Sequence, residues 1–222
     1  RDLVRSLLVL GDVAGARRIW DAAASSDARE DRFIDLAITA READAARLAE
    51  DEATATEREA RFEAVLTNLI EDQPTDPQAW GLRINRLVMR SRLEGRAELL
   101  EEADRVLEDA RTAVRDAVAL EPAILLVLEA RGNDEALASQ LVGIVEARPD
   151  DESARGRLVD VYQRLGRMQD AERIIRVAVD RLGDSERSIP WRRRLGEALA
   201  ARDAYVEAAG VYAEALRITG GT

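Results

Sequence analysis

Three kinds of side chain are missing from this sequence of 222 residues. It contains no cysteine, no histidine and no lysine, so all 33 basic residues are arginines. Without cysteine there are no disulfides and no thiol nucleophiles, and without histidine the usual zinc sites and the Glu-x-x-His di-iron motif are excluded. Lysine Schiff bases are excluded as well. We therefore expect a protein that is not an enzyme and that holds no cofactor and no metal ion.

Aromatic residues and long hydrophobic runs are also scarce. Aromatics make up 4% of the chain and hydrophobic residues 46%, with alanine and leucine throughout. This composition favours many short amphipathic helices over a β-sandwich. No apolar run approaches the roughly 18 residues of a membrane span, so we expect no membrane-spanning segment.

The net charge of −11 is unevenly distributed along the chain. Residues 30–76 hold 5 arginines against 14 acidic residues, whereas residues 152–222 are slightly basic, with 13 arginines against 11 acidic residues. Because most of this surface would repel phosphate groups, a nucleic acid is not an expected partner.

Two distant stretches of the chain share one pattern. LGRMQDAERIIRVAV, which begins at Leu165, and LGDVAGARRIWDAA, which begins at Leu10, both start with Leu-Gly and continue with alanines and larger apolar residues at helical spacing. A glycine after a helix can adopt the left-handed conformation that ends it. The pattern therefore predicts a helical hairpin that occurs more than once.

Hydrophobic periodicity extends the helical prediction to the whole chain. Asp76-Pro77 reads as a helix start, and Asp27 with Glu30 and Thr54 with Glu57 read as capping boxes. The twelve predicted helices span residues 1–10, 13–25, 28–50, 55–72, 77–92, 96–120, 122–131, 134–147, 152–165, 168–182, 189–201 and 204–218. They form six antiparallel pairs.

The hairpins resemble tetratricopeptide repeats, whose 34-residue unit is a helix-turn-helix with conserved small and aromatic positions. The resemblance is carried by Leu158, Tyr162, Gly166, Ala171 and Ala178 in residues 152–185, and by Leu195, Gly196, Tyr205, Ala208, Tyr212 and Ala215 in residues 189–222. Residues 118–151 form a further repeat, residues 1–30 a partial one, and residues 28–120 long atypical hairpins. Because the chain begins inside a repeat, we expect it to be a fragment of a longer protein.

The resemblance implies an all-α, right-handed α-α superhelix of about six hairpins, a single continuous array over residues 1–222 whose first helices line a concave groove. It also implies a scaffold that binds a protein or peptide. The groove positions carried over from the family are Arg157, Asp160, Arg164, Arg193, Arg194 and Glu197. Arginines there would bind carboxylates of an acidic peptide or a C-terminus, or would simply be solvated and paired with neighbours, as Asp160 with Arg164.

Two further alternatives concern the ends and the middle of the array. The last helix carries apolar residues with little chain left to cover them, which predicts self-association through the C-terminal hairpin and makes an oligomerising spacer the rival function. The run AILLVL (Ala123 to Leu128) predicts either a buried core segment or an exposed binding strip.

Overall fold

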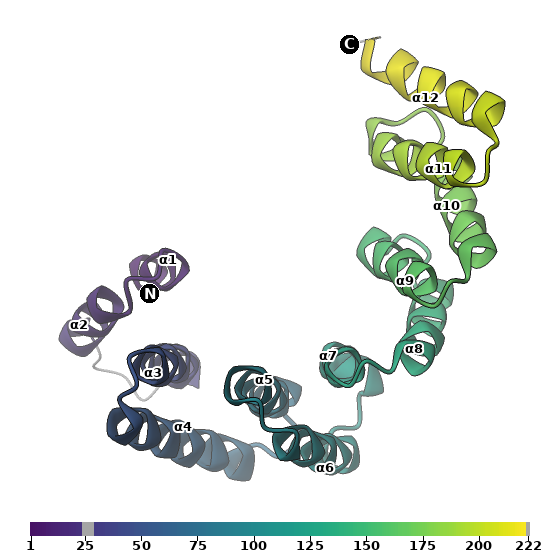
Figure 1. The fold of residues 1–222 in the computed structure, drawn as a ribbon. Helices are drawn as coiled ribbons and strands as arrows, with labels where there is room; N and C mark the ends of the chain where they lie inside the picture. Colours follow the sequence, from purple (N-terminus) through teal and green to yellow (C-terminus); the bar gives the residue numbers. More distant parts are fainter. Residues whose placement is uncertain (24–28, 221–222) are drawn as a thin grey trace. The chain divides into compact units, whose positions relative to one another are not determined.

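A computed structural model of the chain describes residues 1–23 and 29–220, and all the regular secondary structure within them is helical (Figure 1). The α-helices are α1 (Asp2–Val9), α2 (Val13–Ala23), α3 (Arg29–Leu48), α4 (Glu52–Asp72), α5 (Pro77–Glu94), α6 (Glu98–Ala113), α7 (Glu121–Ala130), α8 (Asp134–Ala147), α9 (Glu152–Arg164), α10 (Met168–Leu182), α11 (Ile189–Ala201) and α12 (Tyr205–Gly220). Two short 3₁₀ helices, η1 (Ala117–Leu120) and η2 (Glu186–Ser188), precede α7 and α11.

Six turns of one kind pair these helices within the described residues. Each turn contains one residue with φ between 59° and 81°, and these residues are Gly11, Glu50, Gly95, Gly132, Gly166 and Asp203. The next residue then donates its N–H to the carbonyl five positions back, as Arg167 does to Tyr162 at 2.8 Å. This is the hydrogen bond of a Schellman motif. The predicted all-α fold of six antiparallel, tetratricopeptide-like hairpins is thereby confirmed, and the repeated Leu-Gly is explained.

Short polar side chains begin several helices. Asp76 accepts from the backbone N–H of Gln78 at 3.1 Å and Pro77 opens α5, as predicted. The predicted capping box at Thr54 is wrong, because Asp51 accepts from the N–H of Thr54 at 3.1 Å and α4 begins at Glu52. The predicted capping box at Asp27 lies outside the described residues.

The predicted single helix over residues 96–120 is also wrong. α6 ends at Ala113, and Val114 is extended, with φ −92° and ψ 116°. The Val114 side chain is buried, at 5% exposure, and Asp116 accepts from the N–H of Val118 at 3.0 Å to begin η1. A buried apolar side chain followed by a new cap therefore stops the helix where the periodicity alone would continue it.

Contacts divide the chain into two compact units, residues 1–127 and residues 128–222, which meet inside α7 and are described separately. In unit 1, the first hairpin packs on α3 through Val4, Ala16, Trp20, Ile34 and Ile38. The long hairpins α3/α4 and α5/α6 bury larger apolar side chains such as Leu66, Ile84 and Leu107.

Unit 1 also buries charge between α3, α4 and α5. Six residues make up what we call the buried ion network, in which Glu59 and Arg86 are buried and the other four are partly exposed: Asp44, Arg47, Glu59, Arg86, Arg90 and Glu94. Arg86 donates to both carboxylate oxygens of Glu59, at 3.0 and 2.6 Å, and to Asp44 at 2.6 Å. Three arginines thus balance three carboxylates.

Unit 2 buries the face that the repeat pattern predicts. Leu158, Tyr162, Ala171, Ile175 and Ala178 are all buried between α9 and α10. In the last hairpin, α11 lies so close to α12 that a Cβ added to Gly196 would come within 2.5 Å of the Tyr212 ring. Small residues at the helix crossings therefore set the spacing in this unit.

A buried side chain closes the junction before α5 and the junction before α9. The Trp80 indole nitrogen donates to the carbonyl of Pro74 at 2.8 Å, across the Pro-to-Trp spacing of the repeat pattern. Arg155 likewise follows Pro149 by six residues in the sequence. Its guanidinium donates to the carbonyl of Pro149, while its Nε has no hydrogen-bond partner. Arg155 thus takes the place of a tryptophan.

Candidate protein-binding surfaces

The six predicted site residues lie on the first helices of the last two hairpins in unit 2. α9 carries Arg157, Asp160 and Arg164, and α11 carries Arg193, Arg194 and Glu197. None of the six is buried. They are therefore available on the surface.

Most of these residues already hold an ion-pair partner on another helix. Arg157 pairs with Glu129 of α7 at 3.2 Å, and Arg194 of α11 pairs with Asp160 of α9 at 3.0 Å. The expected pairing of Asp160 with Arg164 is replaced by these contacts, because Arg164 reaches Asp134 of α8 at 2.6 Å. Asp160 and Arg164, which lie one turn apart on α9, therefore each contact a side chain of a neighbouring helix and not each other.

These surface pairs are ionised but contribute little to stability. The hydrogen bond from Arg164 lowers the pKa of Asp134 below its usual value, so the pair is fully ionised at neutral pH. Exposed ion pairs typically contribute about 0–1 kcal/mol, and a carboxylate from a partner could replace one at small cost. Arg193 is the most open of the arginines, with 72% of its side chain exposed and Glu197 3.7 Å away.

A different surface appears on unit 1, between α5 and the segment that forms η1 and α7. This hollow, the α5–α7 groove, has a volume of about 310 Å³. Its lining residues are Pro77, Gln78, Gly81, Leu82, Asn85, Ala119, Pro122, Ala123 and Leu126. None of these lining residues is charged, although charged residues make up 35% of the chain.

A second hollow lies next to the α5–α7 groove on the same unit. This α1–α3 groove, of about 530 Å³, is lined by Arg5, Leu8, Glu30, Phe33, Ile34, Ala37 and Gln78. Arg5 and Glu30 pair across its edge at 2.9 Å. Because Gln78 lines both hollows, the odd-numbered helices of unit 1 present two adjoining recesses to a partner.

Sequence analysis did not find the α5–α7 groove, because the repeat pattern is loose over residues 28–120. A signal was nevertheless present. Gln78, Gly81, Leu82 and Asn85 recur at i, i+3, i+4 and i+7, which places them on one face of a helix. An uncharged face is unusual in so charged a sequence. The run AILLVL contributes both to the core and to this surface, since Leu125 is buried and Leu126 lines the groove.

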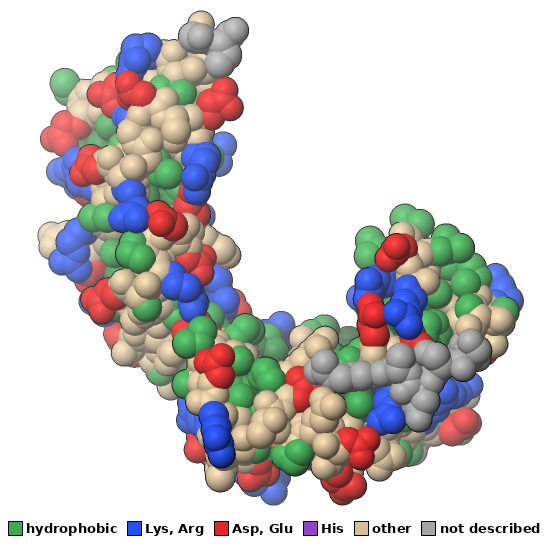
Figure 2. Space-filling model, turned by 180° about the vertical axis from the view of Figure 1, so that it is seen from behind, with side chains coloured by type: hydrophobic (Ala, Val, Ile, Leu, Met, Phe, Trp, Pro, Cys, Tyr) green, Lys and Arg blue, Asp and Glu red, His purple; other side chains and the backbone are tan. Residues whose placement is uncertain are grey.

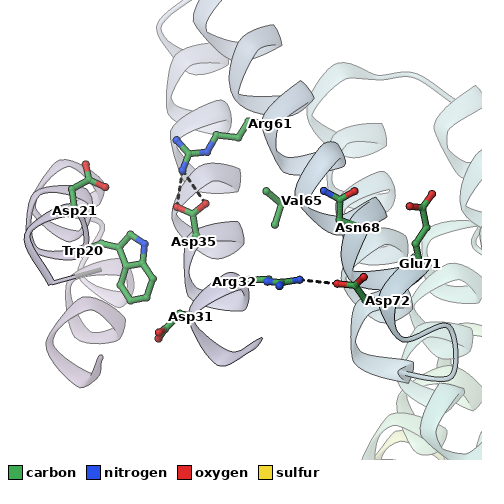
Figure 3. Close-up of a pocket in the computed structure, with 10 residues that line it drawn as sticks. All are labelled: Trp20, Asp21, Asp31, Arg32, Asp35, Arg61, Val65, Asn68, Glu71 and Asp72. Atoms are coloured by element: carbon green, nitrogen blue, oxygen red, sulfur yellow. Dashed lines mark hydrogen bonds and ion pairs between the residues drawn. The ribbon is translucent and has the colours of Figure 1, made fainter. Parts of the chain in front are cut away.

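The opposite, even-numbered side of the first hairpins carries a charged hollow of about 640 Å³ (Figure 3). Trp20 and Asp21 of α2 stand on one side of it, and α3 and α4 supply the rest. Both of its arginines pair with lining carboxylates, Arg61 with Asp35 and Arg32 with Asp72, each at 3.0 Å, and acidic residues outnumber them. This hollow is an ion-paired surface.

Within the described ranges, no group of three or more carboxylates is placed to hold a metal ion. No helix among the residues described is both long and apolar enough to cross a bilayer.

Comparisons with known proteins add little. No family model matches the chain, and no curated protein matches it. Among solved structures, the chain is similar to one named MamA MSR-1 C2, with a TM-score of 0.38 and 15% sequence identity over 99% of this chain and 94% of that chain. A likeness at this level carries no conclusion about function, and the fold described above rests on the turns and helix pairs of this chain.

Proposed function

We propose that the chain is a non-catalytic scaffold that binds a segment of another protein on the odd-numbered helices of unit 1. The α5–α7 groove carries this proposal, because it is an exposed, uncharged recess on a highly charged protein. Recesses lined by apolar residues with a few polar groups are where proteins bind their ligands. The adjoining α1–α3 groove extends the same surface.

In this proposal the arginine surface of α9 and α11 has a supporting role. Arg157, Arg193 and Arg194 can exchange an exposed intramolecular partner for a carboxylate of the bound protein. Such exchange adds specificity and speeds encounter more than it adds affinity. Asp160, Arg164 and Glu197 lie on the same two helices. They pair with Arg194, Asp134 and Arg193, respectively.

The second candidate function is an oligomerising spacer whose ends make the contacts. The last helix supports it, because Val206 is 90% and Leu216 71% exposed on α12. The first helix also exposes Leu3 and Val9, Leu10 just after it is exposed too, and Figure 2 shows hydrophobic side chains gathered over that N-terminal end. Contiguous exposed apolar patches mark interaction surfaces, and a patch built from such residues would support this function.

Affinity capture from the source organism's lysate, with four forms of the chain run in parallel, tests the two candidates. The forms are the parent, Gly81→Leu, Arg157→Glu/Arg194→Glu and Val206→Glu/Leu216→Glu. A protein that the parent captures and that Gly81→Leu or the arginine variant loses supports the scaffold. Loss only with the α12 variant, or capture of this same chain alone, overturns the scaffold and favours the spacer.

A further inference from the structure

The last helix, α12, exposes a side chain that the equivalent helix of the preceding hairpin buries. Positions are equivalent when they lie at the same distance in sequence from the positive-φ residue of their turn, which is Gly166 in the α9/α10 hairpin and Asp203 in the α11/α12 hairpin. Thirteen residues after these turns come Val179 and Leu216. Val179 is 8% exposed and Leu216 71%. α10 packs on α9 and on α11 of the next hairpin, a neighbour that α12 lacks within the described residues.

The first helix, α1, is open on the side that faces away from α2 and α3. Leu3 lies eight residues before the turn at Gly11, as Leu195 of α11 lies eight residues before the turn at Asp203. Leu3 is 57% exposed and Leu195 4%. α11 has α10 of the preceding hairpin beside it, whereas α1 packs on α2 and α3, which bury the adjacent Val4. α1 therefore exposes the side on which a preceding hairpin would pack.

An uncharged strip runs along the exposed side of α12. Its residues recur at i, i+3, i+7 and i+10, a spacing that places them on one helix face, and all four are exposed: Val206, Ala209, Ala213 and Leu216. The equivalent residues of α10 are Gln169, Glu172, Arg176 and Val179. Positions that are polar or charged on the inner helix are thus apolar on the last one. Because charged residues make up 35% of the chain, a face of this kind is better suited to contact with protein than with water.

An ion pair at the α10–α11 junction has apolar residues in its place at the two ends of the chain. Glu172 of α10 pairs at 3.1 Å with Arg202, the C-cap residue of α11. The equivalent of Glu172 on α12 is Ala209. The equivalent of Arg202 is Leu10, which is the C-cap residue of α1 and is 80% exposed. Because an apolar residue on one side alone would leave a charge unpaired against it, this joint change makes the α12 and α1 surfaces match as the two sides of the inner junction do.

We propose that the chain associates head to tail, so that the uncharged strip of α12 in one copy packs on the Leu3 and Leu10 side of α1 in the next copy. The contact repeats the α10–α11 junction between two molecules, and it covers Leu216 and Leu3 as the inner junction covers their equivalents. Because the two surfaces differ, the contact is heterologous, and each bound copy leaves one surface free for another copy. The residues that line the α5–α7 groove belong to neither helix, so this inference does not rest on the scaffold function; it specifies the surfaces that the oligomerising alternative uses.

The test is sedimentation velocity over a range of protein concentrations, with the parent and three variants. Leu3→Glu/Leu10→Glu places charges on the α1 surface, and Val206→Glu/Leu216→Glu places them on the α12 surface. The matched control is Val177→Glu, which adds a charge at an apolar residue of α10 that is 50% exposed. All the substituted side chains are exposed, so circular dichroism should show each variant folded as the parent is.

We expect the average mass of the parent and of Val177→Glu to rise with concentration, and both end variants to stay monomeric. An equal mixture of the two end variants should form dimers that grow no further, because each variant supplies the surface that the other has lost. A parent that is monomeric at every concentration overturns the inference. So does a dimer formed by either end variant alone, which would show a symmetric contact between two copies of one helix, or a loss of association in Val177→Glu.

Discussion

The two units of this chain build the same hairpin, but only unit 1 adds a network of paired charges between its helices to the apolar core. In unit 1, the long helices α3, α4 and α5 meet around charged side chains, with Arg86 4% and Glu59 9% exposed. In unit 2, the helices meet mainly around alanine, leucine and isoleucine, and most ion pairs lie on the surface. Two arginines are buried there, Arg155 and Arg192, but the carboxylates that pair with Arg192, Asp184 and Glu214, are exposed. The backbone turn that joins each pair is the same in both units.

This difference shows that the hairpin is set by its turn and its hydrophobic spacing, whereas the packing between hairpins can use either chemistry. Buried charges are tolerable only when every partner is present, because an unpaired charge in the interior is very unfavourable. The buried ion network meets that condition with three guanidinium groups and three carboxylates. Exposed pairs in unit 2 carry no such requirement.

The largest expected effect comes from removing one member of the buried ion network. Arg86→Ala leaves Glu59 and Asp44 short of a partner between α3 and α5, and breaking a buried pair in this way typically costs about 3–5 kcal/mol. Urea unfolding followed by hydrogen exchange in α4 and α5 measures the loss.

The matched change in unit 2 is Arg164→Ala, which removes an equally short contact to Asp134 from an exposed site. We expect a loss of less than about 1 kcal/mol there. Equal losses in the two variants would contradict the comparison between the units.

Two glycines provide the next test, because the same substitution should act in opposite directions. Gly196→Ala places a methyl group against the Tyr212 ring. Overpacking of this kind costs about 1–3 kcal/mol, offset in part by the roughly 1 kcal/mol that alanine gains over glycine in a helix. A lower melting temperature is expected.

Gly81→Ala meets no neighbour and should raise the stability of unit 1 by about 0.5–1 kcal/mol. Thermal unfolding of both variants beside the parent decides the matter. A lower melting temperature for Gly81→Ala would show that Gly81 has a packing role inside the fold.

Sequence alone predicted the six hairpins and most of unit 2, because the spacing of residues such as Leu158, Tyr162 and Ala171 is that of a buried helix face. It could not predict the buried ion network, since Arg86 and Glu59 look like solvent-exposed positions in a hydrophobic pattern. The sequence could not predict the ion pairs of the candidate site either, for a different reason. The Arg194–Asp160 pair depends on how two helices from different hairpins approach each other, and residue types do not encode that distance.

A fall in pH should destabilise unit 1 more than unit 2. Burial disfavours the ionised form of Glu59, but hydrogen bonds from Arg86 and Arg47 outweigh this and lower its pKa. The pKa of Glu94 is lowered in the same way, against burial, mainly by Arg90. Because both folded-state pKa values lie below the ordinary value of 4.5, their stabilisation is present above that pH and is lost as the pH falls through the lowered values.

Hydrogen exchange between pH 7 and pH 3 should therefore show α4 and α5 losing protection more steeply than α9 and α10. In unit 2, Arg176 and Arg202 lower the pKa of Glu172 against its burial, and arginines lower the pKa of the partly exposed Asp134 and of the exposed Asp184. Arg176 and Arg202 are about half exposed, so water weakens that contribution. A steeper loss in α9 and α10 would mean that the surface pairs matter more than the buried network.

The smallest expected effect is the coupling between Asp134 and Arg164 themselves. A double-mutant cycle with Asp134→Ala and Arg164→Ala should give an interaction of about 0.2–1 kcal/mol at low salt. In 1 M salt the screening length is about 3 Å, so the coupling should become too small to measure. The same cycle on Arg47 and Glu94, which are 3.0 Å apart with both side chains less than one-fifth exposed, should keep most of its coupling at high salt. If both cycles responded to salt alike, the network of unit 1 would be as open to solvent as the surface of unit 2, and the distinction between the two packing chemistries would not hold.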